Sequence, residues 1–66
     1  MLTAREFWDI YLRLANYEQD ECERESNRLA KMSEGERVRQ LNWVNPYLRE
    51  CVRYLVSQKL ELKGAA

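Results

Sequence analysis

Cys22 and Cys51 are the two thiols of this 66-residue chain, and no histidine accompanies them. Cys51 lies among apolar residues at helical spacing, which predicts a small core residue rather than a redox or catalytic group. Cys22 lies within an acidic run, and the negative charge around it disfavours the thiolate that a nucleophile needs. In an antiparallel helical hairpin that turns near residues 32 and 33, the two cysteines would lie about two turns apart, so we expect no disulfide.

The run EQDECERE, residues 18–25, holds five acidic residues against one arginine and has a net charge of −4. Glu18 and Glu21, or Glu21 and Glu25, share a helix face and could hold a hard cation. Without histidine, the Glu-x-x-His spacing of di-iron helical bundles is impossible. Residues 26–66 carry a net charge of +4, which favours an acidic face that is partly paired within the chain. We expect no metal site and no cofactor.

Catalytic motifs are missing from the sequence as well. It contains no Gly-rich phosphate loop and no Ser/Lys or Cys/His arrangement that would activate a nucleophile. Carboxylates are present, but a small helical protein offers no obvious pocket that would shift their pKa values. The sequence therefore predicts a protein that is not an enzyme and has no catalytic residues.

Arginine and aromatic residues alternate along the second half of the chain. Such residues can bind phosphate and stack on bases, but they are also the types most enriched in protein-interface hot spots. A formal net charge of zero and the lack of a helix-turn-helix or zinc pattern favour a protein partner, with nucleic acid as the alternative. The predicted partner-binding residues are Trp43, Tyr47, Arg49, Arg53 and Tyr54.

Two capping boxes mark where the helices that carry these residues should begin. Thr3 with Glu6 and Ser33 with Glu36 both fit the S/T-x-x-E pattern, in which each side chain satisfies a free backbone N–H of the other residue. The first box predicts a helix that starts near Ala4. The second predicts a helix that starts near residue 34.

The spacing of these starts predicts two helices of similar length, over about residues 4–31 and 34–62. With two glycines and one proline in the chain, the composition favours an all-α fold. Two equal arms around a short turn are typical of an antiparallel helical hairpin. We expect residues 1–66 to form a single helical domain.

Pro46 leaves two interpretations of the second arm. An apolar seam at heptad spacing continues past the proline without a change of phase, which favours a continuous helix kinked near residues 45–46. Asn45 as an N-cap and Pro46 as the first helical residue would instead restart the helix. The seam consists of Leu41, Val44, Leu48, Cys51, Leu55, Gln58 and Leu62.

Apolar residues cover most of the circumference of the segment 2–17. A single facing helix covers one stripe only, so this width predicts two or more neighbours. We expect a homodimeric four-helix bundle, in which a second chain supplies the missing neighbour. The alternative is a compact three-helix bundle that covers the segment within one chain. The predicted dimer interface consists of Phe7, Trp8, Tyr11 and Leu14.

No apolar run approaches the roughly 20 residues that cross a bilayer. Charges at Arg5, Glu6 and Asp9 interrupt the N-terminal segment, where a signal peptide would be apolar. We therefore expect a cytoplasmic protein without membrane contact. The sequence as a whole predicts a small helical adaptor or regulator that acts through protein–protein contacts, with itself and an unidentified protein as partners.

Overall fold

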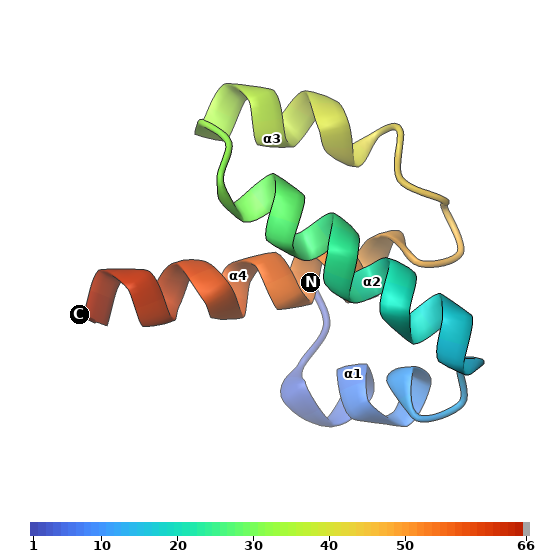
Figure 1. Ribbon diagram of the computed structural model, residues 1–66. Coiled ribbons are helices and arrows are strands. Elements are labelled where there is room, and N and C mark those ends of the chain that lie inside the picture. The colour runs from blue at the N-terminus through green and yellow to red at the C-terminus, as the bar shows by residue number, and fades with distance from the viewer. Residues whose placement is uncertain (66) are drawn as a thin grey trace.

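The computed structural model describes residues 1–65, and all its regular elements are helices: α1 (Ala4–Tyr11), α2 (Asn16–Ala30), α3 (Glu34–Leu41) and α4 (Arg49–Ala65). In Figure 1, α2 crosses in front of α4, while α3 lies on one side of this pair and α1 on the other. The all-α class predicted from the sequence is confirmed. None of the helices within residues 1–65 is both long enough and apolar enough to cross a membrane.

The core lies mainly between α2 and α4, which form the largest interface, with α1 packed on α4 and α3 packed on α2. A stack of aromatic rings extends the core under α1, where Phe7 lies 4.3 Å from Tyr54 between ring centroids. Among residues 1–64, Ser26 is the one buried polar residue, and its hydroxyl donates to the carbonyl of Glu23 at 3.0 Å. The buried apolar residues are Phe7, Leu14, Cys22, Leu29, Val44, Leu48, Cys51, Val52 and Val56.

Both capping boxes mark helix starts, as predicted. The Thr3 amide donates to Glu6 Oε1 at 3.0 Å, and the Glu6 amide donates back to the Thr3 hydroxyl at 3.2 Å. The Thr3 amide, and after it the Thr3 side chain, lowers the pKa of Glu6 by hydrogen bonding that favours the carboxylate form. At the start of α3, the Glu36 amide donates to the Ser33 hydroxyl at 3.4 Å.

The prediction of one continuous helix over residues 4–31 is wrong, because the chain turns between Tyr11 and Asn16. No glycine or proline lies in this turn. Ala15 adopts an extended conformation before α2, and its amide donates to Glu18 Oε1 at 2.9 Å, which is one half of a capping box. The turn directs Leu14 into the core, where 7% of its surface is exposed. Burial of this leucine favours the turn over continuation of the helix.

The second arm is also two helices rather than one kinked helix. The helix restarts, as the alternative interpretation predicted, but α4 begins at Arg49 and not at Pro46. The Asn45 side chain accepts from the Tyr47 amide at 3.0 Å, and the Asn45 carbonyl accepts from the Leu48 amide at 2.9 Å. Pro46 therefore lies where its missing N–H leaves no helical hydrogen bond unmade. The long-armed hairpin is replaced by four helices in a compact arrangement.

The second half of the chain repeats the order of elements of the first, with α3 starting thirty residues after α1 and α4 starting 33 residues after α2. α1 and α3 each have eight residues and follow a hydroxyl N-cap, Thr3 in one and Ser33 in the other. They end with nearly the same backbone geometry, with φ and ψ of −69° and −16° at Leu12 and −68° and −19° at Asn42. Each half is thus a short helix, a turn and a long helix.

The same type of contact closes the turn in both halves. Gln19 of α2 donates from Nε2 to the Tyr11 carbonyl at 2.7 Å. Thirty residues later, Arg49 donates from Nη2 to the carbonyls of Asn42 and Val44 at 3.1 and 3.2 Å. Carbonyls at the end of a helix lack partners within the helix. Arg49 satisfies two carbonyls that follow α3, whereas Gln19 adds a second donor to the Tyr11 carbonyl, which also accepts from the Leu14 amide at 3.1 Å.

Candidate protein-binding surface

Both cysteines are free and buried. The pKa of Cys22 is raised to about 12, first by burial and then by the negative charges of Cys51 and the neighbouring glutamates. Burial and Glu50 raise the pKa of Cys51 in the same direction. Both thiols are therefore neutral at physiological pH, as the sequence predicted for Cys22, and poorly suited to nucleophilic attack. Within residues 1–65, no three Cys, Asp or Glu side chains are grouped as ligands of a metal ion.

Trp43 and Tyr47 lie on the connection between α3 and α4 and are the most exposed of the predicted binding residues. Their side chains are 82% and 70% exposed. The connection that carries them is fixed by hydrogen bonds: the Trp43 amide donates to the Gln40 carbonyl at 2.9 Å, and Asn45 caps the turn before α4. Trp43 also lines a shallow depression with Arg39 and Asn42. Two large aromatic side chains are thus presented to solvent on an ordered segment.

The other three predicted binding residues are less exposed than this pair. Arg49 is half-buried and contacts the carbonyls of the same connection from inside. Tyr54 stacks on Phe7 in the aromatic cluster under α1. Arg53 lies on the side of α4 that faces α3. The structure therefore divides the predicted stripe among three environments.

Acidic residues one helical turn away neutralise several of the arginines. Arg39 forms an ion pair with Glu36, and Arg53 lies 3.8 Å from Glu50. These pairs reduce the positive potential that a phosphate backbone would meet. The acidic run of α2 has one ion pair with the other long helix, between Glu23 and Lys59 at 3.3 Å.

Of the four residues predicted for a dimer interface, only Trp8 is largely accessible. Phe7 and Leu14 are core residues of the single chain, and Tyr11 is half-buried against them. Trp8 is 51% exposed and packs edge-on against the Phe7 and Tyr11 rings. Phe7, Tyr11 and Leu14 of the first segment are therefore covered within the chain, whereas Trp8, Ile10, Leu12 and Tyr17 stay exposed.

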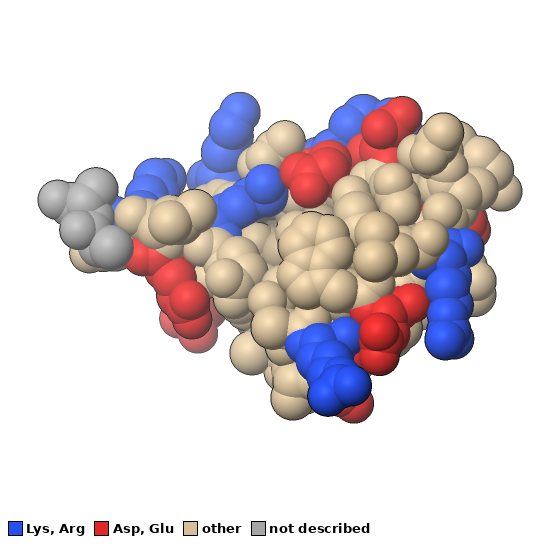
Figure 2. All heavy atoms as spheres, turned by 90° about the horizontal axis from the view of Figure 1, so that it is seen from below, with Lys and Arg blue, Asp and Glu red and all other residues tan. Residues whose placement is uncertain are grey.

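The α1 side of the molecule still presents an uncharged surface. Figure 2 shows this face, with acidic and basic side chains around an uncharged centre. Leu12, at the end of α1, is 72% exposed, and its amide donates to the Trp8 carbonyl at 3.1 Å. The two side chains therefore lie one helical turn apart on the same side of α1.

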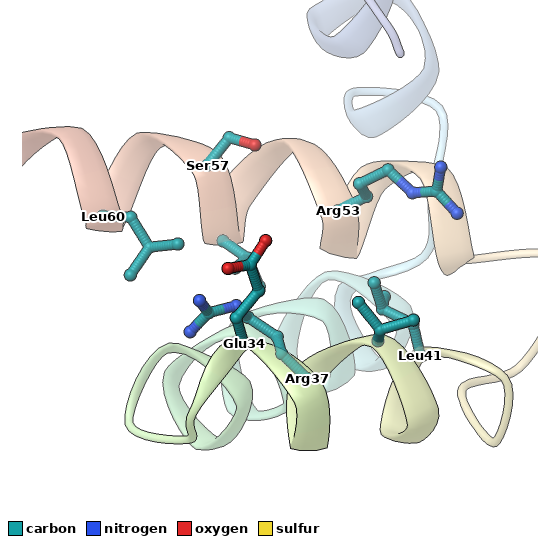
Figure 3. Close-up of a pocket in the computed structure, with 8 residues that line it drawn as sticks. Glu34, Arg37, Leu41, Arg53, Ser57 and Leu60 are labelled. Atoms are coloured by element: carbon teal, nitrogen blue, oxygen red, sulfur yellow. The ribbon is translucent and has the colours of Figure 1, made fainter.

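A groove of about 360 Å³ separates α3 from α4 and was not predicted from the sequence. Figure 3 shows α4 along one wall and α3 along the other, with Glu34 and Arg37 reaching from α3 toward α4. The sequence signal that could have revealed the groove is Val38, an apolar residue between two arginines of α3. Its side chain is 61% exposed in the structure. The groove is lined by Glu34, Arg37, Val38, Leu41, Arg53, Val56, Ser57 and Leu60.

Comparison of the chain with protein-family models, with curated proteins and with solved structures found no match.

Proposed function

We propose that this protein is a non-enzymatic helical adaptor or regulator that acts by binding another protein through the connection between α3 and α4. The observation that carries the proposal is the exposure of Trp43 and Tyr47 on a hydrogen-bonded segment. Aromatic side chains contribute a large apolar contact area and are enriched among interface hot spots. Because the segment is ordered before binding, association loses less conformational entropy than it would with a mobile loop.

The internal repeat provides a matched control for this proposal. Tyr17 is the counterpart of Tyr47 in the first half and is 73% exposed, against 70% for Tyr47. The position that corresponds to Trp43 is Arg13, so the first half has no equivalent aromatic pair. Replacement of either tyrosine removes a similar exposed area, but only Tyr47 lies on the connection that also carries an exposed tryptophan.

The test is affinity capture from cell lysate with the tagged full chain, followed by mass spectrometry and a binding titration with the protein that is retained. We expect Trp43→Ser and Tyr47→Ser each to weaken binding about tenfold or more, as hot-spot residues do. Tyr17→Ser should bind like the wild type. Equal effects of the two tyrosine substitutions, or retention of nucleic acid alone, would contradict the proposal.

Self-association through the α1 face is a second proposal, supported by the exposed pair Trp8 and Leu12 on an uncharged surface. Apolar surface without a partner favours association with a second copy of the same surface. Sedimentation equilibrium of the wild type and of Leu12→Gln tests it. A dimer that Leu12→Gln dissociates is the expected result, and a monomer at tens of micromolar would exclude the homodimer.

A further inference from the structure

Among residues 1–65, the three main helix interfaces all join one half of the chain to the other half. α2 packs on α4, α1 packs on α4, and α3 packs on α2. The first half holds α1 and α2, and the second half holds α3 and α4. Among these residues, neither half has a comparable interface between its own two helices. Each half therefore covers the apolar surface of the other half rather than its own.

The two halves are joined by three residues, Lys31, Met32 and Ser33. Lys31 already has a helical conformation, with φ of −87° and ψ of −9°. Ser33 has φ of −65° and ψ of 161°, so rotation of ψ to about −40° is enough to bring this residue into the helical region. The connection contains no glycine or proline, and lysine and methionine are good helix formers. These residues are therefore able to join α2 and α3 into one helix.

Few hydrogen bonds hold the turn between α2 and α3. The Glu36 amide donates to the Ser33 hydroxyl at 3.4 Å, and Arg37 donates from Nη1 to the Met32 carbonyl at 2.8 Å. In a continuous helix, the amides at the start of α3 pair instead with the carbonyls at the end of α2, which is the usual helical pattern. Opening of the turn therefore replaces these side-chain bonds with backbone bonds.

The direction of the two helices decides what an opened chain can bind. In Figure 1, α2 and α3 run in opposite directions on the two sides of the connection. Because of this, a joined helix over residues 16–41 fits antiparallel against the same helix of a second copy, and α3 of each copy then contacts α2 of the other. The hydrogen bond from Arg28 Nη1 to Gln40 Oε1, 3.1 Å long within the chain, forms between the copies instead.

The remaining interfaces follow the same exchange. The stacked rings of Phe7 and Tyr54 and the ion pair of Glu23 with Lys59 each join the first half to the second half. After the exchange, each pair joins one copy to the other with the same partners. The interface between the copies is thus the core of the single chain, and its shape complementarity is already present.

We propose that two copies of this chain exchange halves at the connection between α2 and α3 and form a domain-swapped dimer. Each core then consists of the first half of one copy and the second half of the other. The single chain is favoured in dilute solution, because a three-residue connection keeps its halves at a high effective concentration. This dimer differs from self-association through the α1 face, whose interface is an exposed surface.

The experiment is refolding of the full chain from urea at micromolar and at millimolar concentration, with a reducing agent, followed by gel filtration. We expect a dimer after refolding at millimolar concentration. A carbodiimide, which couples a carboxylate to an adjacent amine, then shows how the chains are connected. Glu23 and Lys59 lie 3.3 Å apart between α2 and α4, so their coupling gives a covalent dimer only if the halves are exchanged. Mass spectrometry identifies the bond, and Lys59→Arg, which cannot couple, is the control.

Substitutions at the connection test whether α2 and α3 join in the dimer. Glu34→Pro suits the first position of α3 after the extended Ser33, but not the interior of a continuous helix. It should lower the dimerisation constant about tenfold or more. Ala4→Pro occupies the same position after the extended Thr3 of α1, outside the connection, and should leave the constant unchanged.

Ser33→Ala should act in the opposite direction. It removes a hydroxyl that caps α3 in the single chain and has no such role in a continuous helix. The dimerisation constant should therefore rise about tenfold or more, since each of the two chains no longer loses a cap when it opens. Thr3→Ala is the matched control, because it removes the equivalent cap of α1, which is the same in both forms.

Absence of a dimer after refolding at millimolar concentration would overturn the proposal, as would a dimer in which Glu23 and Lys59 couple only within each chain. So would equal effects of the two proline substitutions or of the two alanine substitutions. Leu12→Gln should leave the swapped dimer intact, because Leu12 is 72% exposed and lies outside the core. A dimer that Leu12→Gln dissociates is instead the one that forms through the α1 face.

Discussion

Gln19 and Arg49, thirty residues apart in the sequence, make equivalent contacts near the starts of the two long helices. Gln19 donates to the carbonyl of Tyr11, the last residue of α1. Arg49 donates to the carbonyls of Asn42, just after α3, and of Val44 in the connection. The Tyr11 hydroxyl adds a bond to the Gln19 carbonyl at 3.3 Å, so the contact in the first half runs in both directions. These contacts connect each short helix to the next long helix where neither glycine nor a disulfide stabilises the turn.

Removal of either side chain should destabilise the fold. We expect Gln19→Ala and Arg49→Ala each to lower the free energy of unfolding by about 1–3 kcal/mol, because partly buried carbonyls lose their donors. Arg24→Ala, at an exposed position of α2, is the control and should change stability by no more than about 0.5 kcal/mol. Urea denaturation measures the differences. If Arg24→Ala lowered the free energy of unfolding as much as the other two substitutions, the Gln19 and Arg49 contacts would have no specific stabilising effect.

A side-chain acceptor at the N-cap of α2 should stabilise the fold. Ala15 occupies the N-cap position but has no side-chain acceptor for the free amides of the first turn. Ala15→Ser should raise the free energy of unfolding by about 0.5–1 kcal/mol, and Thr3→Ala at the corresponding position of α1 should lower it by a similar amount. Thermal unfolding followed by circular dichroism would detect both changes. No gain from Ala15→Ser would mean that the extended geometry at Ala15 is not that of an N-cap.

The turn before α4 predicts a loss of stability, from a different physical cause, for substitutions at each of two adjacent residues. Asn45→Ala removes the acceptor of the Tyr47 amide and should cost about 1 kcal/mol. Pro46→Ala removes no hydrogen bond and only frees the backbone angle φ that proline fixes. It should lower the free energy of unfolding by less than Asn45→Ala does, about 0.4–1 kcal/mol, because the unfolded chain gains conformational entropy. Chemical denaturation of both variants separates the two effects. A stabilising Pro46→Ala would instead indicate that the proline strains a continuous helix.

The starts of α1 and α3 were predictable because capping boxes are local: the donors and acceptors lie within four residues of one another. The turn after Tyr11 was not predictable in this way. Its cap residue is an alanine, and what favours the turn is the burial of Leu14 in a core that exists only after α4 has packed. Tertiary burial thus outweighs a local sequence preference for continued helix.

The prediction of an apolar seam through the second half of the chain was partly correct, for a related reason. Val44, Leu48 and Cys51 are all buried as the heptad spacing predicted, although the helix restarts between them. The turn at Pro46 preserves the direction in which these side chains point, so their spacing could not distinguish a kink from a restart. At the far end the pattern fails, since Leu62 is 74% exposed on a part of α4 that extends beyond its neighbours. The α3–α4 groove was not foreseen because it depends on which helices pack together.

Stability should decrease in alkaline solution because of the buried thiols. Cys22 keeps its proton in the folded chain until a pH of about 12, whereas its ordinary pKa is 9.0. The contribution of the protonated Cys22 thiol to the free energy of unfolding is therefore complete below pH 9. It is lost as the pH rises above 9, because the unfolded chain then binds fewer protons than the folded chain. The slope reaches about 1.4 kcal/mol per pH unit. Urea denaturation at pH 8, 9 and 10 in the presence of a reducing agent measures this slope.

Cys22→Ala is the control for the alkaline effect. The variant should be less stable than the wild type at pH 8, because a buried side chain has been shortened. Its stability should nevertheless fall less steeply between pH 9 and pH 10. All groups other than Cys22 are the same in both proteins, so their contributions largely cancel in the comparison. Parallel slopes in the two proteins would mean that the Cys22 thiol titrates normally in the fold.

The pairing of each short helix with the long helix of the other half has a consequence for how the protein is made. While the chain emerges from the ribosome, α1 has to wait for α4 before Phe7 can be covered, so the first half cannot complete its core during synthesis. The same dependence makes the two halves complementary fragments. Peptides 1–32 and 33–66 should each be largely unstructured alone and should gain helicity when mixed, as circular dichroism would show. The nascent chain therefore becomes stable only after α4 has been synthesised.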